Sequence, residues 1–193
     1  MKNYILLFIF ALPIWASNGF AQTEMDTFLK AYQTKFLKGE KLNISINDAQ
    51  NGYMFGCLPL EGEKDCSMES YSYAFAVWKT AKGDKIWGVF RHACGGMGCW
   101  GQNMGDLRFY DNMLMDITNN VYDIRKAQKE ADATELKIDG NNDVDALQRN
   151  IYAEIPRKGT TIQLTVGLVG VVSKNFASLI FDKSTGKFEL IKK

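Results

Sequence analysis

The segment with the greatest potential for chemistry is a short cysteine-bounded and glycine-rich stretch, which reads RHACGGMGCWG over residues 91–101. Its glycines permit backbone conformations that other residues avoid and let a partner approach the main chain closely. A disulfide would hold the loop rigid, and an exposed tryptophan at its edge could stack on a sugar ring, a peptide or a protein pocket. We therefore interpret 92–101 as a recognition loop, with the candidate binding residues His92, Gly95, Gly96, Met97 and Trp100.

The same stretch also fits a purely structural crossover in which Trp100 lies in the core. A second alternative is a small periplasmic enzyme or metal-binding protein centred on His92, the single histidine, with Asp106 or Asp111 as its partner. Catalysis would require His92 in a cleft within hydrogen-bond reach of a carboxylate, whereas recognition would require an exposed Trp100. No serine has the context of a nucleophile elbow, and we predict no catalytic residues.

Three metal sites can be considered, and each has an incomplete ligand set. A zinc site needs a third and a fourth ligand beside a cysteine pair, but His92 is the single histidine, and in an oxidising compartment the cysteines are expected to form disulfides. Residues 139–145 resemble a calcium loop, but they lack its central glycine, and Asn150 stands where a bidentate glutamate is required. Soft copper ligands near His92 would be methionines, which more often fill cores, namely Met97, Met104, Met113 and Met115. We predict no metal and no cofactor.

The four cysteines all follow residue 21, and an even number in an exported chain predicts two disulfides. Three pairings are possible. We favour Cys57–Cys66 and Cys94–Cys99, because each pair brackets a turn-rich segment. Loops this short lose little entropy on closure, so each disulfide would add only about 2–3 kcal/mol of stability.

Residues 1–21 have the pattern of a secretory signal. Lys2 provides the positive start, residues 5–16 are apolar, and small residues precede Gln22 at the positions that signal peptidase reads. The apolar stretch is shorter than the roughly 20 residues that span a bilayer, and no cysteine follows it for lipidation. We predict cleavage before Gln22, no membrane anchor, and a periplasmic or extracellular domain formed by residues 22–193.

The charge of this domain restricts its partners. The whole chain has a net charge of +1, and Lys2 is the only charged residue before Gln22, so residues 22–193 are formally neutral. A neutral chain has no electrostatic attraction to nucleic acid or to an anionic membrane surface. We therefore expect no nucleic-acid partner, and the remaining candidates are a protein or a glycan.

The first of the elements that must support the loop is an amphipathic helix over residues 24–38. Its apolar residues recur with helical spacing and form one stripe, namely Met25, Phe28, Leu29, Tyr32 and Phe36. Thr23 fits an N-cap, and Gly39 follows the last turn as a C-cap residue does. The width of the stripe predicts that this helix packs on a sheet.

Short strands separated by turn dipeptides follow this helix. We expect hairpins around Asn51-Gly52 and Lys82-Gly83-Asp84, and a third around Asp111-Asn112. The strands expected are 42–46, 53–57, 71–79, 85–92, 107–110, 113–117, 151–155, 161–166, 176–181 and 187–191. A second helix is expected from residue 119 or 120 to about 133, with inward-facing Val121, Ile124, Gln128 and Ala131.

These patterns predict a single α+β domain, in which an antiparallel meander of short strands has the N-terminal helix packed on one face. Residues 71–117 and 151–191 share an order of strands and turns, which indicates a duplicated four-stranded unit. The function predicted is non-enzymatic recognition of a protein or glycan through the 92–101 loop. Inhibition of a secreted hydrolase would be one form of it.

Overall fold

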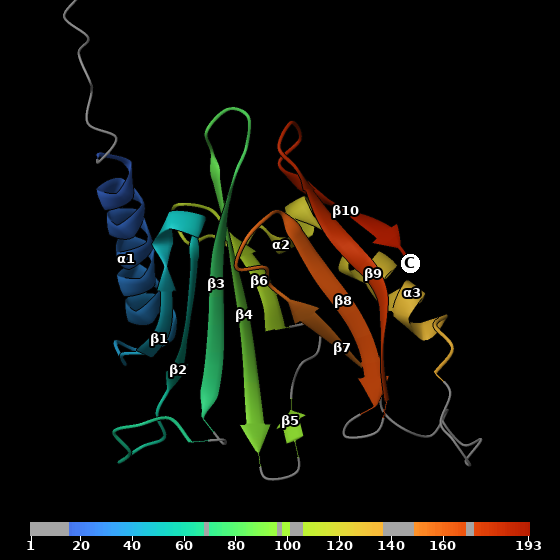
Figure 1. The fold of residues 1–193 in the computed structure, drawn as a ribbon, viewed down its shortest axis with the longest axis horizontal. Coiled ribbons are helices and arrows are strands. Elements are labelled where there is room, and N and C mark those ends of the chain that lie inside the picture. The colour runs from blue at the N-terminus through green and yellow to red at the C-terminus, as the bar shows by residue number, and fades with distance from the viewer. Residues whose placement is uncertain (1–15, 68–69, 96–97, 101–105, 137–148, 169–171) are drawn as a thin grey trace, which may run out of the picture.

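The fold is seen in a computed structural model that describes residues 16–67, 70–95, 98–100, 106–136, 149–168 and 172–193. Side chains are described for the same ranges, except at 16–21, 93–95, 98–100, 149–150, 168 and 172. Within this part of the chain the strands form two antiparallel sheets (Figure 1). Both sheets and the helix before them confirm the predicted α+β class.

The first sheet, sheet A, has six strands in the order β1-β2-β3-β4-β5, with β6 also paired to β4. Its strands are β1 (Asn43–Asp48), β2 (Tyr53–Leu58), β3 (Tyr71–Lys79), β4 (Lys85–Gly95), β5 (Gly98–Trp100) and β6 (Leu107–Tyr110). A single 3-10 turn, η1 (Ala49–Asn51), joins β1 to β2. The hairpins predicted at Asn51-Gly52 and at residues 82–84 are therefore confirmed.

The second sheet, sheet B, has four strands in the order β10-β9-β8-β7. They are β7 (Arg149–Glu154), β8 (Thr161–Leu168), β9 (Val172–Asp182) and β10 (Lys187–Lys192). Sheet B is a simple meander, whereas in residues 71–117 both β5 and β6 pair with β4. The internal duplication stays a prediction.

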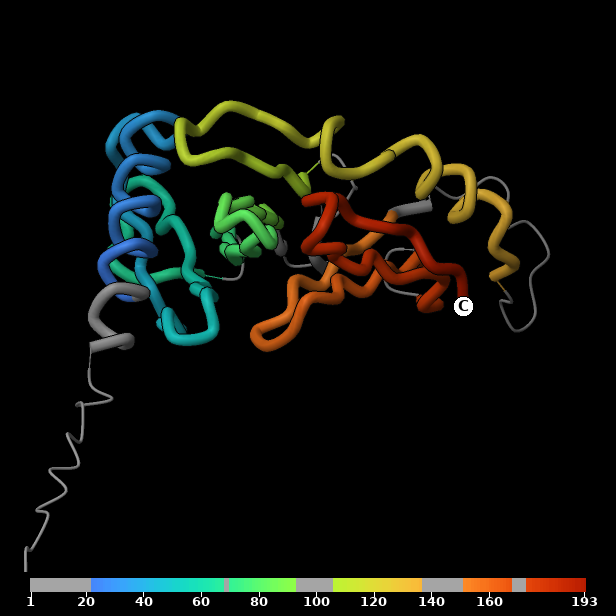
Figure 2. Tube along the Cα trace, turned by 90° about the horizontal axis from the view of Figure 1, so that it is seen from above, coloured from blue at the N-terminus to red at the C-terminus, as the bar shows by residue number. Residues whose placement is uncertain are grey.

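Helix α1 (Ala16–Phe36) packs on one face of sheet A, and sheet B lies on the other side of that sheet (Figure 2). The helix buries Met25, Phe28 and Tyr32 against strands β2, β3 and β4, as the apolar stripe predicted. The predicted start at Thr23 is wrong, because the Thr27 hydroxyl donates to the Thr23 carbonyl within a continuous helix. No proline separates Ala16 from Thr23, so the helix continues toward the N-terminus.

The second helix is also corrected, because it divides into α2 (Thr118–Val121) and α3 (Ile124–Asp132). Asp123 causes the break: its carboxylate accepts hydrogen bonds from the backbone N–H groups of Arg125 and Lys126 and so caps α3. Val121 and Ala131 are buried as predicted, but Gln128 is exposed and Ala127 is buried in its place.

Residues 113–117 do not form the predicted strand. One carboxylate oxygen of Asp111 accepts hydrogen bonds from the N–H groups of Met113 and Met115, and this closes a turn instead. Leu114 has a positive φ of 56°, and only Asp116 bridges back to Tyr110. Met113 and Met115 are 78% and 62% exposed, so neither is a core residue.

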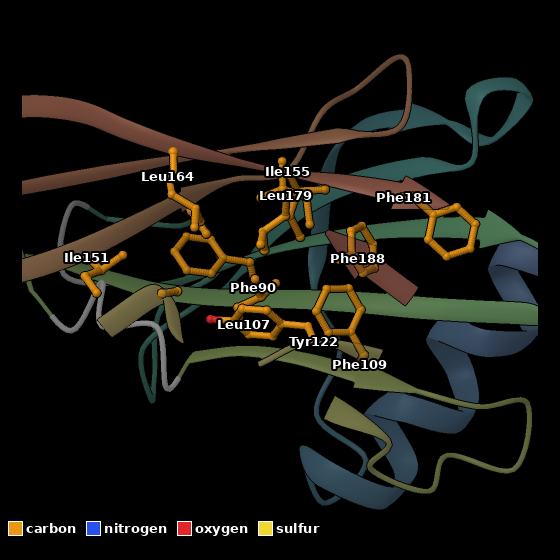
Figure 3. Close-up of a cluster of buried hydrophobic side chains, with 14 of the residues drawn as sticks. Phe90, Leu107, Phe109, Tyr122, Ile151, Ile155, Leu164, Leu179, Phe181 and Phe188 are labelled. Atoms are coloured by element: carbon orange, nitrogen blue, oxygen red, sulfur yellow. The ribbon is translucent and has the colours of Figure 1, made fainter. Parts of the chain in front are cut away.

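The main hydrophobic core lies between the two sheets and is closed by α2 and α3 (Figure 3). Phe109 of sheet A and Phe188 of sheet B meet there with ring centroids 4.7 Å apart. A smaller core joins α1 to the opposite face of sheet A. In the part of the chain that the structure describes, no helix combines the length and apolar character needed to cross a membrane.

Candidate functional site

The predicted recognition loop is the turn of the β4–β5 hairpin. Cys94 and Cys99 are register partners in this hairpin. Directly opposed residues of antiparallel strands have Cα atoms about 4.5–5.5 Å apart, a spacing that a disulfide can bridge. Gly96 and Met97 lie outside the described residues, and only the backbone is described for Cys94, Gly95, Cys99 and Trp100. The second disulfide and the exposure of Trp100 therefore stay predictions.

The first predicted disulfide, Cys57–Cys66, is confirmed, with a Cα–Cα distance of 6.1 Å. Cys57 lies near the end of β2, an inner strand between β1 and β3, and Cys66 lies in the connection to β3, so the bond ties this connection to the end of β2. Nearby, the Asn43 amide donates to the Lys64 carbonyl and makes a second tie across the same segment.

Replacing Cys57 and Cys66 together by serine is expected to lower the free energy of unfolding by about 2–3 kcal/mol. The reason is that the unfolded chain, without the disulfide, regains the conformational entropy that the closed loop had removed. Urea denaturation of the double variant measures this loss. The matched control is Glu63→Ala, an exposed change within the same connection. A denaturation midpoint equal to that of the control would contradict the prediction.

His92 lies at the start of the loop, on the face of sheet A that is turned toward the main core. It is half-buried, and its ring lies 6.1 Å from that of Phe55 and 5.8 Å from that of Phe90. Burial lowers the pKa of His92, and its buried Nδ1 atom has no hydrogen-bond partner. Among the described residues, no carboxylate is hydrogen-bonded or ion-paired with His92, although the nearby charge of Asp106 partly opposes the lowering of its pKa.

The two acidic residues considered as partners of His92 have other contacts. Asp111 closes the turn at residues 111–115. Asp106 pairs with Arg91, at 3.4 Å between its Oδ1 atom and the guanidinium. Arg91 precedes the loop on β4, and Asp106 lies directly before β6, so this ion pair joins the two ends of the segment that contains the loop.

A cavity of about 320 Å³ opens beside this ion pair, between the end of α1 and the outer face of sheet A. It is lined by residues of α1, β3, β4 and β6 and by the residues next to α1 and β6, namely Tyr32, Phe36, Leu37, Tyr73, Val89, Arg91, Asp106, Arg108 and Tyr110. We call it the tyrosine–arginine pocket. Arg91, which lines this pocket, directly precedes the 92–101 segment along the chain, whereas the His92 side chain lies on the opposite face of sheet A.

Three tyrosines form the inner wall of the tyrosine–arginine pocket. Tyr32, Tyr73 and Tyr110 are all buried, and the Tyr32 ring lies edge-on to the other two, 6.4 Å from that of Tyr73 and 5.9 Å from that of Tyr110 between centroids. Burial raises the pKa of each tyrosine above its ordinary value, so the hydroxyls stay protonated and can donate hydrogen bonds. Phe36 also lines the pocket but is 39% exposed.

The charged side chains of the pocket are two guanidinium groups and one carboxylate. Arg108 has only a long ion pair outside the pocket, 3.8 Å from Asp116. Arg91 also lies over the Tyr71 ring, with its guanidinium carbon 5.4 Å from the ring centroid. Burial raises the pKa of Asp106, although the neighbouring Arg91 partly opposes this shift. The pocket therefore has an excess of positive charge in a protein that is otherwise nearly neutral.

The sequence predicted the 92–101 loop as a candidate binding segment, but it did not predict most of the residues that line the pocket. Asp106 was considered only as a partner for His92, and Tyr32 and Phe36 were assigned to the apolar stripe of the helix. Arg91 is the residue in the sequence that could have indicated this pocket. On the helix-facing side of β4 it follows the buried Trp87 and Val89 and ends that series of buried residues. A charged residue at an inward position of a strand is a common sign of a functional cavity.

The structure describes only part of the metal sites that were considered from the sequence. Among the described residues, no three histidine, cysteine, aspartate or glutamate side chains gather in one place. The calcium-like segment 139–145, with Met97 and Met104, lies outside the described residues.

Comparisons of this chain with protein-family models, with curated proteins and with solved structures find no match in any of the three. The interpretation of the site therefore depends on its own geometry. What that geometry offers is a concave surface with hydrogen-bond donors, two guanidinium groups and an exposed aromatic ring. Such a combination is typical of binding pockets for polar ligands.

Proposed function

We propose that this protein is an exported, non-enzymatic binding protein that recognises a protein or a glycan where the tyrosine–arginine pocket meets the 92–101 loop. The observation that carries the proposal is the 320 Å³ cavity at the base of that loop, lined by polar aromatic and guanidinium side chains. Tyrosine and arginine are the residues most enriched in energetically important recognition sites. Inhibition of a secreted hydrolase by loop insertion would be one form of this binding.

Two further observations support export and recognition. The Cys57–Cys66 disulfide is compatible with an oxidising compartment, as the pattern of residues 1–21 predicts. The walls of the pocket belong to secondary structure that is paired on both sides of β4, so the ligand groups are held before a ligand arrives. The register of Cys94 opposite Cys99 would allow the same preorganisation in the loop.

Trp100→Ala is expected to weaken binding by about 2 kcal/mol or more, the scale of an aromatic anchor at an interface, and to leave the melting temperature nearly unchanged. Binding of the purified exported domain to immobilised glycans and to purified secreted hydrolases measures the first effect, and thermal denaturation measures the second.

Met113→Ala is the matched control for this experiment, because Met113 is an exposed apolar residue outside the pocket. Its binding and melting temperature should equal those of the wild type. A loss of about 3–5 kcal/mol of stability in Trp100→Ala, as for a buried tryptophan, would show that Trp100 is a core residue and would overturn the role of the loop.

A further inference from the structure

We propose that the tyrosine–arginine pocket binds an acidic sugar residue, with the carboxylate of a uronate between Arg91 and Arg108 and the pyranose ring against the aromatic wall. This inference rests on the proposed function and specifies its ligand class. Three properties of the pocket support it: its charge, its size, and the pairing of the strands that form its floor.

The charge of the pocket favours an anion. Arg91 and Arg108 both line it, and among the described residues of the lining Asp106 is the only acidic one. The contacts of both guanidinium groups with carboxylates are long, 3.4 Å to Asp106 and 3.8 Å to Asp116, so most of their N–H donors are available to a ligand. A guanidinium can bind a carboxylate through two parallel hydrogen bonds, which a lysine cannot do.

The size and lining of the pocket favour a single sugar ring. Its volume of about 320 Å³ is at the lower end of the range of small-molecule sites, roughly 300–1,000 Å³. The hydroxyls of Tyr32, Tyr73 and Tyr110 can exchange hydrogen bonds with ring hydroxyls. Phe36 provides an exposed aromatic face for the C–H groups of the ring.

The main chain below the pocket favours a glycan over an extended peptide. Peptides commonly bind by adding a strand to a free sheet edge, but β3 pairs with β2 and β4, and β4 pairs with β3 and β6. The outer edge of β6 is also occupied, because the Phe109 N–H donates to the Thr118 hydroxyl and the Phe109 carbonyl accepts from the Ile117 N–H. Recognition in the pocket must therefore use side chains.

Calorimetry with matched oligosaccharides tests this inference on the full exported domain. The probes are oligosaccharides containing glucuronate, galacturonate or mannuronate, each compared with the same oligosaccharide after reduction of its carboxylates to alcohols. We expect at least one uronate probe to bind about tenfold or more tightly than its reduced form, because a charge-assisted hydrogen bond contributes about 1.5–3 kcal/mol.

Two kinds of variant assign this preference to the pocket. Arg91→Gln and Arg108→Gln should each weaken uronate binding about tenfold and leave the reduced probe unaffected. Asp106→Asn should have the opposite effect and strengthen uronate binding, because it removes the acidic side chain of the lining. Arg125→Gln is the matched control, since this exposed arginine lies on α3 outside the pocket. Arg91 and Arg108 are both exposed, so replacing either of them should leave the fold intact. Thermal denaturation of each variant checks this.

Three results would overturn the inference. Equal affinity for a uronate probe and its reduced form would exclude carboxylate recognition while leaving the proposed binding function in place. Arginine-dependent binding of glutamate-rich peptides, without binding of uronates, would assign the pocket to a protein partner. Uronate binding that is unaffected by Arg91→Gln, Arg108→Gln and Asp106→Asn would place the ligand elsewhere. Only a loss of all glycan and protein binding would also contradict the proposed function.

Discussion

Phe109→Ala is expected to lower the free energy of unfolding by about 3–5 kcal/mol, the cost of deleting a large buried aromatic side chain. Phe109 is 0% exposed. Its ring contacts Phe188 of sheet B at 4.7 Å, Trp78 of β3 at 5.9 Å and Tyr122 after α2 at 6.3 Å between centroids. The substitution removes the side chain at which both sheets and the helical segment meet, so the cavity cannot be closed by moving one neighbour.

Equilibrium denaturation in urea measures the loss. Ile180→Ala is the control, because Ile180 is a large apolar side chain that is 41% exposed on β9. Ile180→Ala should lower the free energy of unfolding far less than Phe109→Ala, because the Ile180 side chain is already partly in contact with water in the folded protein. A loss of less than about 1 kcal/mol for Phe109→Ala would mean that the two sheets are not joined through this side chain.

The local elements of the fold follow directly from the sequence, and the division into two sheets does not. Turn signals such as Asn51-Gly52 define hairpins, because they specify the backbone conformation of the turn itself. On β3, however, Tyr73 and Phe75 face α1, while Ala74 and Ala76 face the main core. A strand buried on both faces has no polar side, and its pattern does not show which partner covers which face.

The candidate site was harder to predict than the fold, because its residues come from four separate elements. Tyr32, Tyr73 and Tyr110 each fit a core position within their own helix or strand. Only the register that places Tyr73 opposite Arg91, together with the packing of α1, brings them into one cavity. The 92–101 loop could be proposed from the sequence because clusters of glycine and cysteine are unusual in a single stretch of chain, whereas a pocket is a property of tertiary packing.

Trp87 of β4 packs against Phe28 of α1. We expect Trp87→Ala to cost about 3–5 kcal/mol of stability, because Trp87 is 4% exposed and is the main contact of β4 with the helix. Its ring stacks on Phe28 with centroids 4.2 Å apart, and its Nε1 atom donates to the Asn112 side chain at 2.9 Å. Denaturation in urea measures the cost.

The same variant should also impair the tyrosine–arginine pocket, since α1 contributes Tyr32 and Phe36 to its wall. Hydrogen exchange separates this effect from global unfolding: backbone amides of α1 should exchange faster in Trp87→Ala, while those of β8 and β9 keep most of their protection. Trp87→Phe is the matched control, because it keeps an aromatic ring beside Phe28 while it loses part of the indole and the hydrogen bond to Asn112, which contributes about 1 kcal/mol. If the amides of α1 remained as protected in Trp87→Ala as in this control, the helix would be held by other contacts, and the pocket would not depend on the Trp87–Phe28 stack.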